Sequence, residues 1–351
     1  MDKFISFKPI DSKVKTIGRT CLDENQVRWL GLSGSGIEFL VLDNSFSIEL
    51  VADSMYKSEP HRARFAIYID DKLYVDQVMN VPKLTFTHTN NKTSMSVRII
   101  KVSECAQSTI GISSIDVVES GDIIPSTPKG KLIEFIGDSI TCGYGVDVED
   151  PIGKFSTSSE DFRKSFAYLT ATALDCDYSM VSYSGYGIIS GYTESDTPHP
   201  DILPPIYNKV GWSLGFKDNF SISNISWNFN EQPDLIVINL GTNDATYIKD
   251  NQDREHRFTL SYVDFLKVVR QHNPKAPIIC TLGIMGDKLF PAISKAVELY
   301  RAETLDENIS TFKFDVQMEE DGYSIGWHPT FATYQKASNK LLDYIQKNIK
   351  F

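Results

Sequence analysis

The chain has 351 residues, with 35 Lys and Arg against 46 Asp and Glu, which gives a formal net charge of -11 at pH 7. This length predicts one large or two medium domains, either of them with ample core. The acidic balance, and the absence of a Lys/Arg cluster interleaved with aromatic residues, argue against nucleic acid and anionic membranes as partners.

The N-terminal segment, MDKFISFKPIDSK, lacks the apolar core behind a basic end that marks an export signal. No apolar run elsewhere in the sequence approaches the roughly twenty residues that span a bilayer. We therefore expect a cytoplasmic protein with no membrane partner, or a secreted one if a leader has been removed from the sequence given.

Up to about residue 120 the sequence pattern is that of β-strands. Alternation of apolar and polar residues with period two predicts half-buried strands, because successive side chains of a strand point to opposite faces. Turn-like residues such as Asp70-Asp71-Lys72 separate the strands. The alternating apolar residues are Phe46, Ile48 and Leu50, then Phe65, Ile67 and Ile69, and then Met95, Val97 and Ile99. We predict an all-β jelly-roll sandwich over residues 1–122.

The next segment, residues 123–130, contains Pro125, Pro128 and Gly130 and is predicted to be an interdomain linker. From residue 131 to residue 351, short apolar runs alternate with helical patterns. The runs are KLIEFIG, DLIVINLG, APIICTLG and TFKFDV, and the last helix is expected over residues 333–349. This alternation predicts an α/β three-layer domain with a parallel sheet and helices on both faces.

Small and polar residues follow several of the predicted strands. Ser139 comes after KLIEFIG, Gly185 follows the run ending in VSYS, Asn243 follows DLIVINLG, and His328 precedes the last helix. Because the carboxyl ends of parallel strands meet at one edge of a sheet, we expect these residues to converge there. Structural alternatives remain open: a turn or cap at Asp138-Ser139, a cap at Asn243, a positive-φ turn at Gly185, and a satisfied structural histidine at His328.

The residue types at these positions fit acyl transfer. A serine hydroxyl becomes a nucleophile when a base takes its proton, and the imidazole of His328 has a suitable pKa for that work. The oxyanion needs donors, which the Ser139 and Gly185 amides and the Asn243 side chain would supply. No metal or other cofactor is required, and the five cysteines lack Cys-x-x-Cys spacing. We expect Cys142, close to Ser139, to be a buried filler.

Four blocks resemble those of the SGNH, or GDSL, hydrolases. They are GDSI at 137–140, SG at 184–185, GTND at 241–244 and WHP at 327–329. The resemblance implies Ser139 as nucleophile, His328 as base, and the Ser139, Gly185 and Asn243 groups as oxyanion donors. It covers about residues 131–351.

Three further segments resemble carbohydrate esterase family two: IGRT at 17–20, LSGSGIEFLV at 32–41 and WNFNEQPDLIVINLGTND at 227–244. Members of that family pair a jelly-roll domain with an SGNH domain and remove O-acetyl groups from plant polysaccharides, often from the sugar 6-position. The resemblance therefore implies an acetyl xylan esterase-like enzyme that deacetylates xylan- or mannan-type oligo- or polysaccharides through an acetyl-enzyme.

One position departs from the superfamily pattern. Most SGNH enzymes carry an aspartate three residues before the histidine, but here that position is Ile325, followed by Gly326. The sequence leaves open whether a carboxylate or a backbone carbonyl orients His328. We expect a Ser-His dyad, in which a carbonyl near Ile325 or Gly326 holds the imidazole and Asp321, the nearest acid upstream, is dispensable.

Two aromatic residues are candidate platforms for a sugar ring: Trp327, beside the base, and Tyr186, with a weaker claim. Either could equally belong to the core. Two other functions also remain open. One is a lipase- or thioesterase-like acyl hydrolase, because the blocks define acyl chemistry but not the leaving group; the other is a catalytically weak glycan-binding protein. The polysaccharide backbone, the acetylated position and the oligomeric state are not predicted.

Overall fold

The computed structural model describes residues 4–87 and 94–350. The chain divides into two compact units, and each is discontinuous in sequence. The first, which we call the sandwich unit, comprises Met1–Pro128, Ser156–Ser158 and Lys209–Trp227; the second, the α/β unit, comprises Lys129–Phe155, Ser159–Asn208 and Asn228–Phe351.

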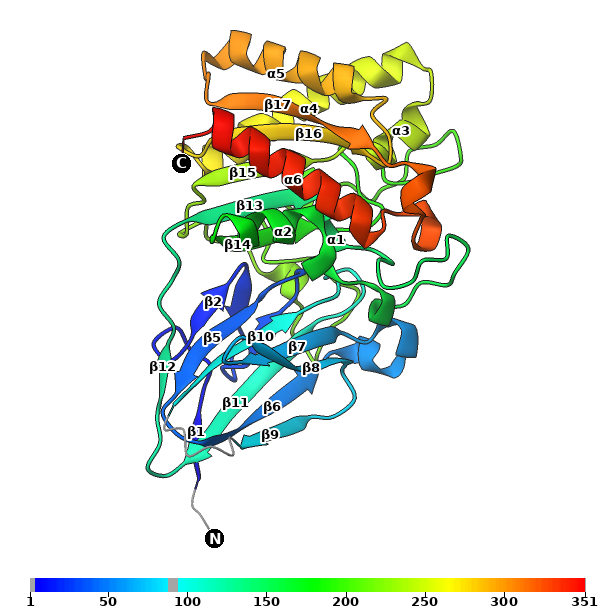
Figure 1. Ribbon diagram of the computed structural model, residues 1–351. Helices are drawn as coiled ribbons and strands as arrows, with labels where there is room; N and C mark the ends of the chain where they lie inside the picture. The colour runs from blue at the N-terminus through cyan, green and yellow to red at the C-terminus, as the bar shows by residue number, and fades with distance from the viewer. Residues whose placement is uncertain (1–3, 88–93, 351) are drawn as a thin grey trace. The chain divides into compact units, whose positions relative to one another are not determined.

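The sandwich unit contains two antiparallel sheets (Figure 1). Their strands are β1 (Phe4–Phe7), β2 (Lys15–Ile17), β3 (Thr20–Leu22), β4 (Arg28–Leu30), β5 (Gly36–Val41), β6 (Ser45–Ala52), β7 (Arg64–Ile69), β8 (Lys72–Val78), β9 (Lys83–Thr87), β10 (Met95–Lys101), β11 (Ile110–Val118) and β12 (Ile123–Pro125). One sheet has the order β3-β4-β11-β6-β9 with β1 on β11, and the other has β12-β5-β10-β7-β8 with β2 on β5. The alternating residues of β6, β7 and β10 are buried together in one core, which confirms the predicted β-sandwich.

Residues 123–125 fall in the segment expected to be a linker, and they form β12. This strand pairs with β5 in antiparallel register, with Ile123 opposite Val41. Ile123 is buried in the sandwich core. Ile123 and Ile124 therefore belong to an edge strand of this sheet, which ends at Pro125. Proline is tolerated in an edge strand, although Pro125 and Pro128 are also typical of a linker.

Residues 209–227 lie within the range expected for the second domain, but they belong to the sandwich unit. Phe220 stacks on Trp29 of β4, with ring centroids 5.2 Å apart. The Arg19 guanidinium donates to the Lys209 carbonyl at 2.9 Å and lies 5.6 Å from the Trp227 ring. These contacts join residues 190 to 208 positions apart, so no local pattern in the sequence could indicate them.

The α/β unit contains a parallel sheet in the order β14-β13-β15-β16-β17 (Figure 1). Its strands are β13 (Leu132–Gly137), β14 (Asp177–Ser182), β15 (Leu235–Asn239), β16 (Ile278–Ile284) and β17 (Ile309–Val316), and its α-helices are α1 (Ser139–Cys142), α2 (Phe166–Ala173), α3 (Thr242–Ile248), α4 (Gln252–His272), α5 (Phe290–Thr304) and α6 (Phe331–Asn348). Helix α2 packs with α6, and α4 packs with α5, so helices flank the sheet as predicted.

The order in which the chain adds strands to this parallel sheet reverses at β13. From β13 the chain moves to β14 at one edge and then returns to the other side of β13 through β15, β16 and β17. In open α/β sheets, ligands bind outside the carboxyl ends of the strands at such a switch point. The loops that follow β13, β14 and β15 are therefore where a functional site is expected.

Helix α6 shows how the local sequence determines an element. Thr330 caps its first turn by accepting a hydrogen bond from the Thr333 amide. Tyr334, Ala337, Leu341 and Ile345 recur at helical spacing and are buried. The helix lies within two residues of the boundaries predicted from this pattern.

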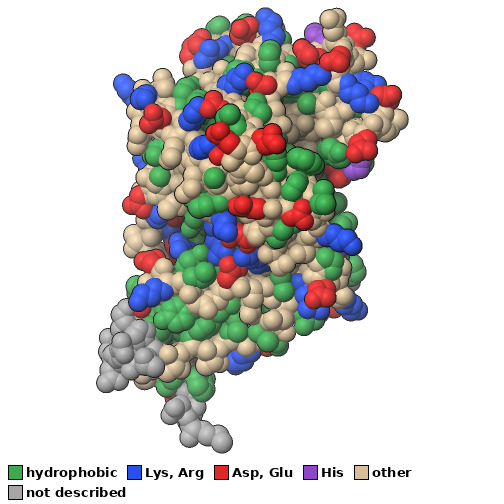
Figure 2. All heavy atoms as spheres, turned by 45° about the vertical axis from the view of Figure 1, so that its right-hand side comes forward, with side chains coloured by type: hydrophobic (Ala, Val, Ile, Leu, Met, Phe, Trp, Pro, Cys, Tyr) green, Lys and Arg blue, Asp and Glu red, His purple; other side chains and the backbone are tan. Residues whose placement is uncertain are grey.

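Among the described residues, no helix is long and apolar enough to cross a membrane. Figure 2 shows acidic and basic side chains interspersed over the face that it displays. This mixture agrees with the modest excess of acidic residues in the sequence.

Candidate active site

Ser139 lies at the turn from β13 into α1. The Asp138 side chain caps this short helix by accepting a hydrogen bond from the Ile140 amide at 3.0 Å, and Ser139 is its first residue. Gly137 is required just before, because a Cβ there would lie 2.1 Å from the Thr141 hydroxyl. Both interpretations of the motif therefore hold together: Asp138 is a helix cap, and the cap places Ser139 at the carboxyl end of the strand.

His328 lies beside Ser139. Its Nε2 atom is 2.8 Å from the Ser139 hydroxyl oxygen, and its Nδ1 atom is 2.9 Å from the Ile325 carbonyl oxygen. A carbonyl can only accept, so the proton resides on Nδ1 and Nε2 is left as the acceptor for the Ser139 hydroxyl. This tautomer is the one in which histidine can take a proton from serine.

The turn before His328 brings the Ile325 carbonyl to the imidazole. Gly326 and Trp327 both have left-handed backbone angles, with φ of 64° and 63°. The Gly326 amide also donates to the Pro151 carbonyl at 3.0 Å. Asp321, the nearest acid upstream, forms an ion pair with Lys336 at 2.6 Å instead of reaching the imidazole.

The surroundings of His328 favour the neutral imidazole. Burial lowers its pKa from 6.5 to about 4, although the hydrogen bonds with Ile325 and Gly326 act in the opposite direction. The ring is therefore unprotonated throughout the neutral pH range and can accept a proton.

Asn243 lies in the first turn of α3, whose cap is Gly241 rather than Asn243. Its side-chain amide donates to the Tyr186 carbonyl at 2.8 Å and lies 3.4 Å from an Asp138 carboxylate oxygen. The structure therefore does not use Asn243 as a cap, and its amide lies near the residue that precedes Ser139.

Gly185 follows β14 and has a φ of 82°, as the turn interpretation expected. No heavy atom lies within 4 Å of the position that a Cβ would take there. Gly187 is required for a different reason, because a Cβ would lie 2.0 Å from the Ser190 carbonyl oxygen. A side chain is excluded at position 187 by crowding, whereas glycine is favoured at position 185 by the left-handed backbone conformation.

Asp244 supports the loop that carries Gly185. Its buried carboxylate accepts hydrogen bonds from the Ile188 amide at 2.9 Å, the Ile189 amide at 2.7 Å and the Ser190 amide at 3.1 Å. Burial raises the pKa of Asp244 to about 6, and these amides oppose the rise. The GTND block contains this acid, but the loop that it supports lies more than fifty positions earlier in the sequence.

The two candidate sugar platforms differ in exposure. Trp327 is 56% exposed, and its ring lies 5.2 Å from that of Tyr323. Tyr186 is only 5% exposed and packs against Tyr183. The placement of Tyr186 does not support a role as a platform; what it offers the site is the backbone carbonyl that holds Asn243.

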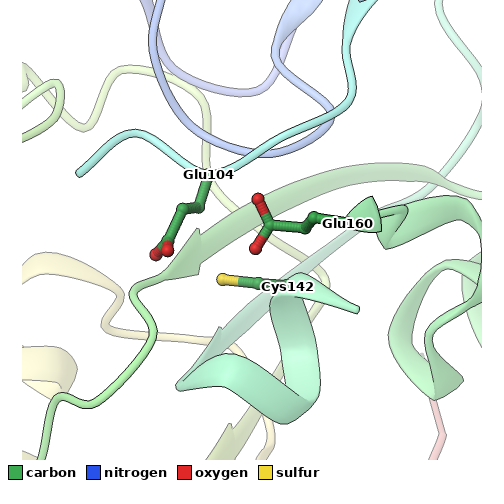
Figure 3. Close-up of side chains that lie close together, drawn as sticks. All are labelled: Glu104, Cys142 and Glu160. Carbon is green, nitrogen blue, oxygen red and sulfur yellow. The ribbon is translucent and has the colours of Figure 1, made fainter. Parts of the chain in front are cut away.

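Cys142 is fully buried in α1, as expected for a small filler, and its thiol donates to the Ser182 hydroxyl at 3.3 Å. Figure 3 shows its sulfur close to the carboxylate of Glu160, and the two groups lie within 4.8 Å of each other. Glu104, the third side chain labelled there, belongs to the sandwich unit. The Ser139–His328 pair does not involve Cys142.

Comparison with known proteins tests the family resemblance. The model of the GDSL-like Lipase/Acylhydrolase family matches residues 135–336, a range that contains Ser139, Gly185, Asn243 and His328. This match confirms the resemblance that the four sequence blocks indicated.

Two curated relatives are each 30% identical to the chain over 63% of its length. They are the cellulase/esterase CelE of Acetivibrio thermocellus and an acetylxylan esterase / glucomannan deacetylase of Cellvibrio japonicus. The chain spans 26% of the length of the first and 60% of the second. Among solved structures, an acetyl xylan esterase, Est2A, from the rumen bacterium Butyrivibrio proteoclasticus superposes with a TM-score of 0.87 at 25% identity, covering 99% of both chains.

Proposed function

The chain belongs to the GDSL-like lipase/acylhydrolase family, whose model matches more than half of it, and on that premise we propose that it is a serine esterase that removes O-acetyl groups from acetylated plant oligo- or polysaccharides. The observation that carries this proposal is the 2.8 Å contact between Ser139 Oγ and His328 Nε2. The Nδ1 atom of the same ring is held by a carbonyl, which sets the tautomer that the reaction needs.

Acylation begins when His328 Nε2 takes the Ser139 proton and Oγ attacks the acetyl carbonyl. The Ser139 and Gly185 amides and the Asn243 side chain are the proposed donors to the developing oxyanion. His328 then gives its proton to the departing sugar oxygen, so the carbon–oxygen bond breaks and the acetyl group remains on Ser139.

Deacylation repeats these steps with water in place of the sugar. His328 takes a proton from water, the hydroxide attacks the acetyl-enzyme, and the same proton returns to Ser139 Oγ as acetate leaves. The Ile325 carbonyl keeps the ring oriented through both half-reactions but supplies only a partial negative charge to the imidazolium.

Two observations support an acetylated sugar as substrate. Relatives at 30% identity bear the names cellulase/esterase and acetylxylan esterase / glucomannan deacetylase. Trp327, directly before the base in sequence, offers an exposed aromatic surface of the kind on which pyranose rings stack. We therefore place the acetyl group at Ser139 and the sugar against Trp327.

The test is acetate release from acetylated xylan, acetylated glucomannan and nitrophenyl esters of increasing acyl length. We expect Ser139-dependent release from at least one polysaccharide, and a kcat/KM for the acetate ester about a hundredfold or more above that for the octanoate ester. Preference for long acyl chains would favour the lipase alternative. Sugar binding without Ser139-dependent turnover would favour a glycan-binding protein.

The pH dependence of kcat/KM should reflect the pKa of about 4 at His328. The base works in its neutral form, so activity is lost as pH falls through this pKa, and a lowered pKa moves the acid limb to lower pH. Between pH 7.5 and 5.5 we expect kcat/KM on a nitrophenyl acetate to fall by less than about threefold, whereas an ordinary imidazole would lose about tenfold. An acid limb near pH 6.5 would contradict the lowered pKa of His328.

A further inference from the structure

The Tyr144 ring lies against the imidazole of His328. The two ring centroids are 4.5 Å apart with an interplanar angle of 36°. On Tyr144 the Phe155 ring also stacks, at 4.1 Å and nearly parallel. Two rings at such separations cannot occupy the same face, so Tyr144 is sandwiched between Phe155 and His328.

The backbone around Tyr144 is fixed by close packing. Gly143 and Gly145 on either side have φ of 71° and 66°, which favour glycine. A Cβ on Gly145 would lie 2.7 Å from the Cβ of Ile325, the residue whose carbonyl holds His328. The Tyr144 amide donates to the Ser139 carbonyl at 3.1 Å. The Gly-Tyr-Gly segment therefore contacts both partners of the proposed dyad.

The contact between Tyr144 and His328 bears on the charge that forms on the imidazole during the reaction. In a triad, the third residue orients the imidazole and stabilises the imidazolium that forms during the reaction. Here the Ile325 carbonyl orients the ring at 2.9 Å but carries no full charge. The face of an aromatic ring attracts a cation within about 6 Å of its centroid.

We propose that Tyr144, fixed by Phe155, is a positioning residue whose ring face stabilises the imidazolium of His328 in the transition state, in place of the missing carboxylate. This role rests on the esterase function proposed above. It gives a function to the Gly-Tyr-Gly segment that follows Ser139. This segment contains neither the nucleophile nor a proposed oxyanion donor.

The experiment is a fluorination series at position 144 in the 351-residue chain. Tyr144→Phe is followed by replacement with 4-fluoro-, 3,5-difluoro- and 3,4,5-trifluorophenylalanine, which withdraw electron density from the ring face while nearly keeping its shape. For nitrophenyl acetate hydrolysis we expect Tyr144→Phe to keep kcat within about threefold, the fluorinated rings to lower kcat stepwise to about a tenth, and KM to change by less than about threefold.

The same series at Phe312 is the matched control, because that ring packs against Phe314 and Tyr344 and should leave kcat unchanged. If kcat stayed constant across the fluorinated rings at position 144, the proposal would be overturned, since a merely structural ring tolerates fluorine. A large loss in Tyr144→Phe would also overturn it, because the hydroxyl would then be the active group. Failure of the esterase function is distinguishable, since wild-type protein itself would then lack Ser139-dependent turnover.

Discussion

Replacing Ser139 with alanine is expected to leave the fold intact and to lower kcat for acetate release by at least about 10⁴-fold. The hydroxyl contacts His328 Nε2 at 2.8 Å and is the proposed nucleophile, so its removal eliminates the acetyl-enzyme. The Ser139 amide and the Asp138 cap of α1 remain in Ser139→Ala. Stopped assays of acetate, together with circular dichroism and thermal unfolding, measure the two expectations separately.

Ser139→Ala also tests the assignment as a whole. A Ser139→Ala protein that keeps its melting temperature and turns over at the wild-type rate would exclude Ser139 as nucleophile. Cys142 lies one turn further along the chain and provides a matched control: we expect Cys142→Ala to keep kcat within about threefold, because its thiol is buried and bonds to Ser182.

Replacing His328 with alanine is expected to reduce kcat by a similar factor, about 10⁴-fold or more. Without the imidazole, no group takes the Ser139 proton in acylation or activates water in deacylation. Since both steps fail together, the loss should appear in kcat rather than KM, and a pre-steady-state burst of nitrophenol should be absent. A burst with slow turnover would show that His328 acts in deacylation alone.

The matched control for His328→Ala is Asp321→Asn. The Asp321 carboxylate pairs with Lys336 at 2.6 Å, so the isosteric change removes one ion pair and leaves the Ile325 carbonyl on His328. We expect the activity of Asp321→Asn to stay within about threefold of wild type, because an ion pair with an exposed lysine contributes little. A thousandfold loss without unfolding would reinstate a charged third member and contradict the dyad.

Much of the fold could be predicted from the sequence because it is determined locally. Period-two alternation of apolar residues predicts the half-buried strands β6, β7 and β10. Short apolar runs predict the strands β13, β15, β16 and β17. The division of the chain into two units could not be predicted as fully from the sequence. Residues 209–227 join the sandwich unit through contacts such as Phe220 on Trp29, and no local pattern predicts a pairing across that separation.

Within the site, too, some groups could be predicted from the sequence and others could not. Ser139, His328 and Asn243 stand out because their types are unusual at strand ends and have chemical roles. The Ile325 carbonyl, the Tyr186 carbonyl and the Tyr144 ring do not, because every residue has a carbonyl and an aromatic ring is ordinarily core. Such groups become recognisable only when the folded chain brings them within hydrogen-bonding or stacking distance.

The discontinuity of the sandwich unit limits how the protein can be divided. Cutting at Pro128 would separate the first strands from Lys209–Trp227, which the remaining chain would still carry. Phe220 would lose Trp29, and Trp227 would lose Arg19. The fragment from Lys129 onward is therefore not an independent module. In fusion proteins, truncation libraries or domain exchanges, it must be kept together with the first 128 residues or be given a redesigned replacement for residues 209–227.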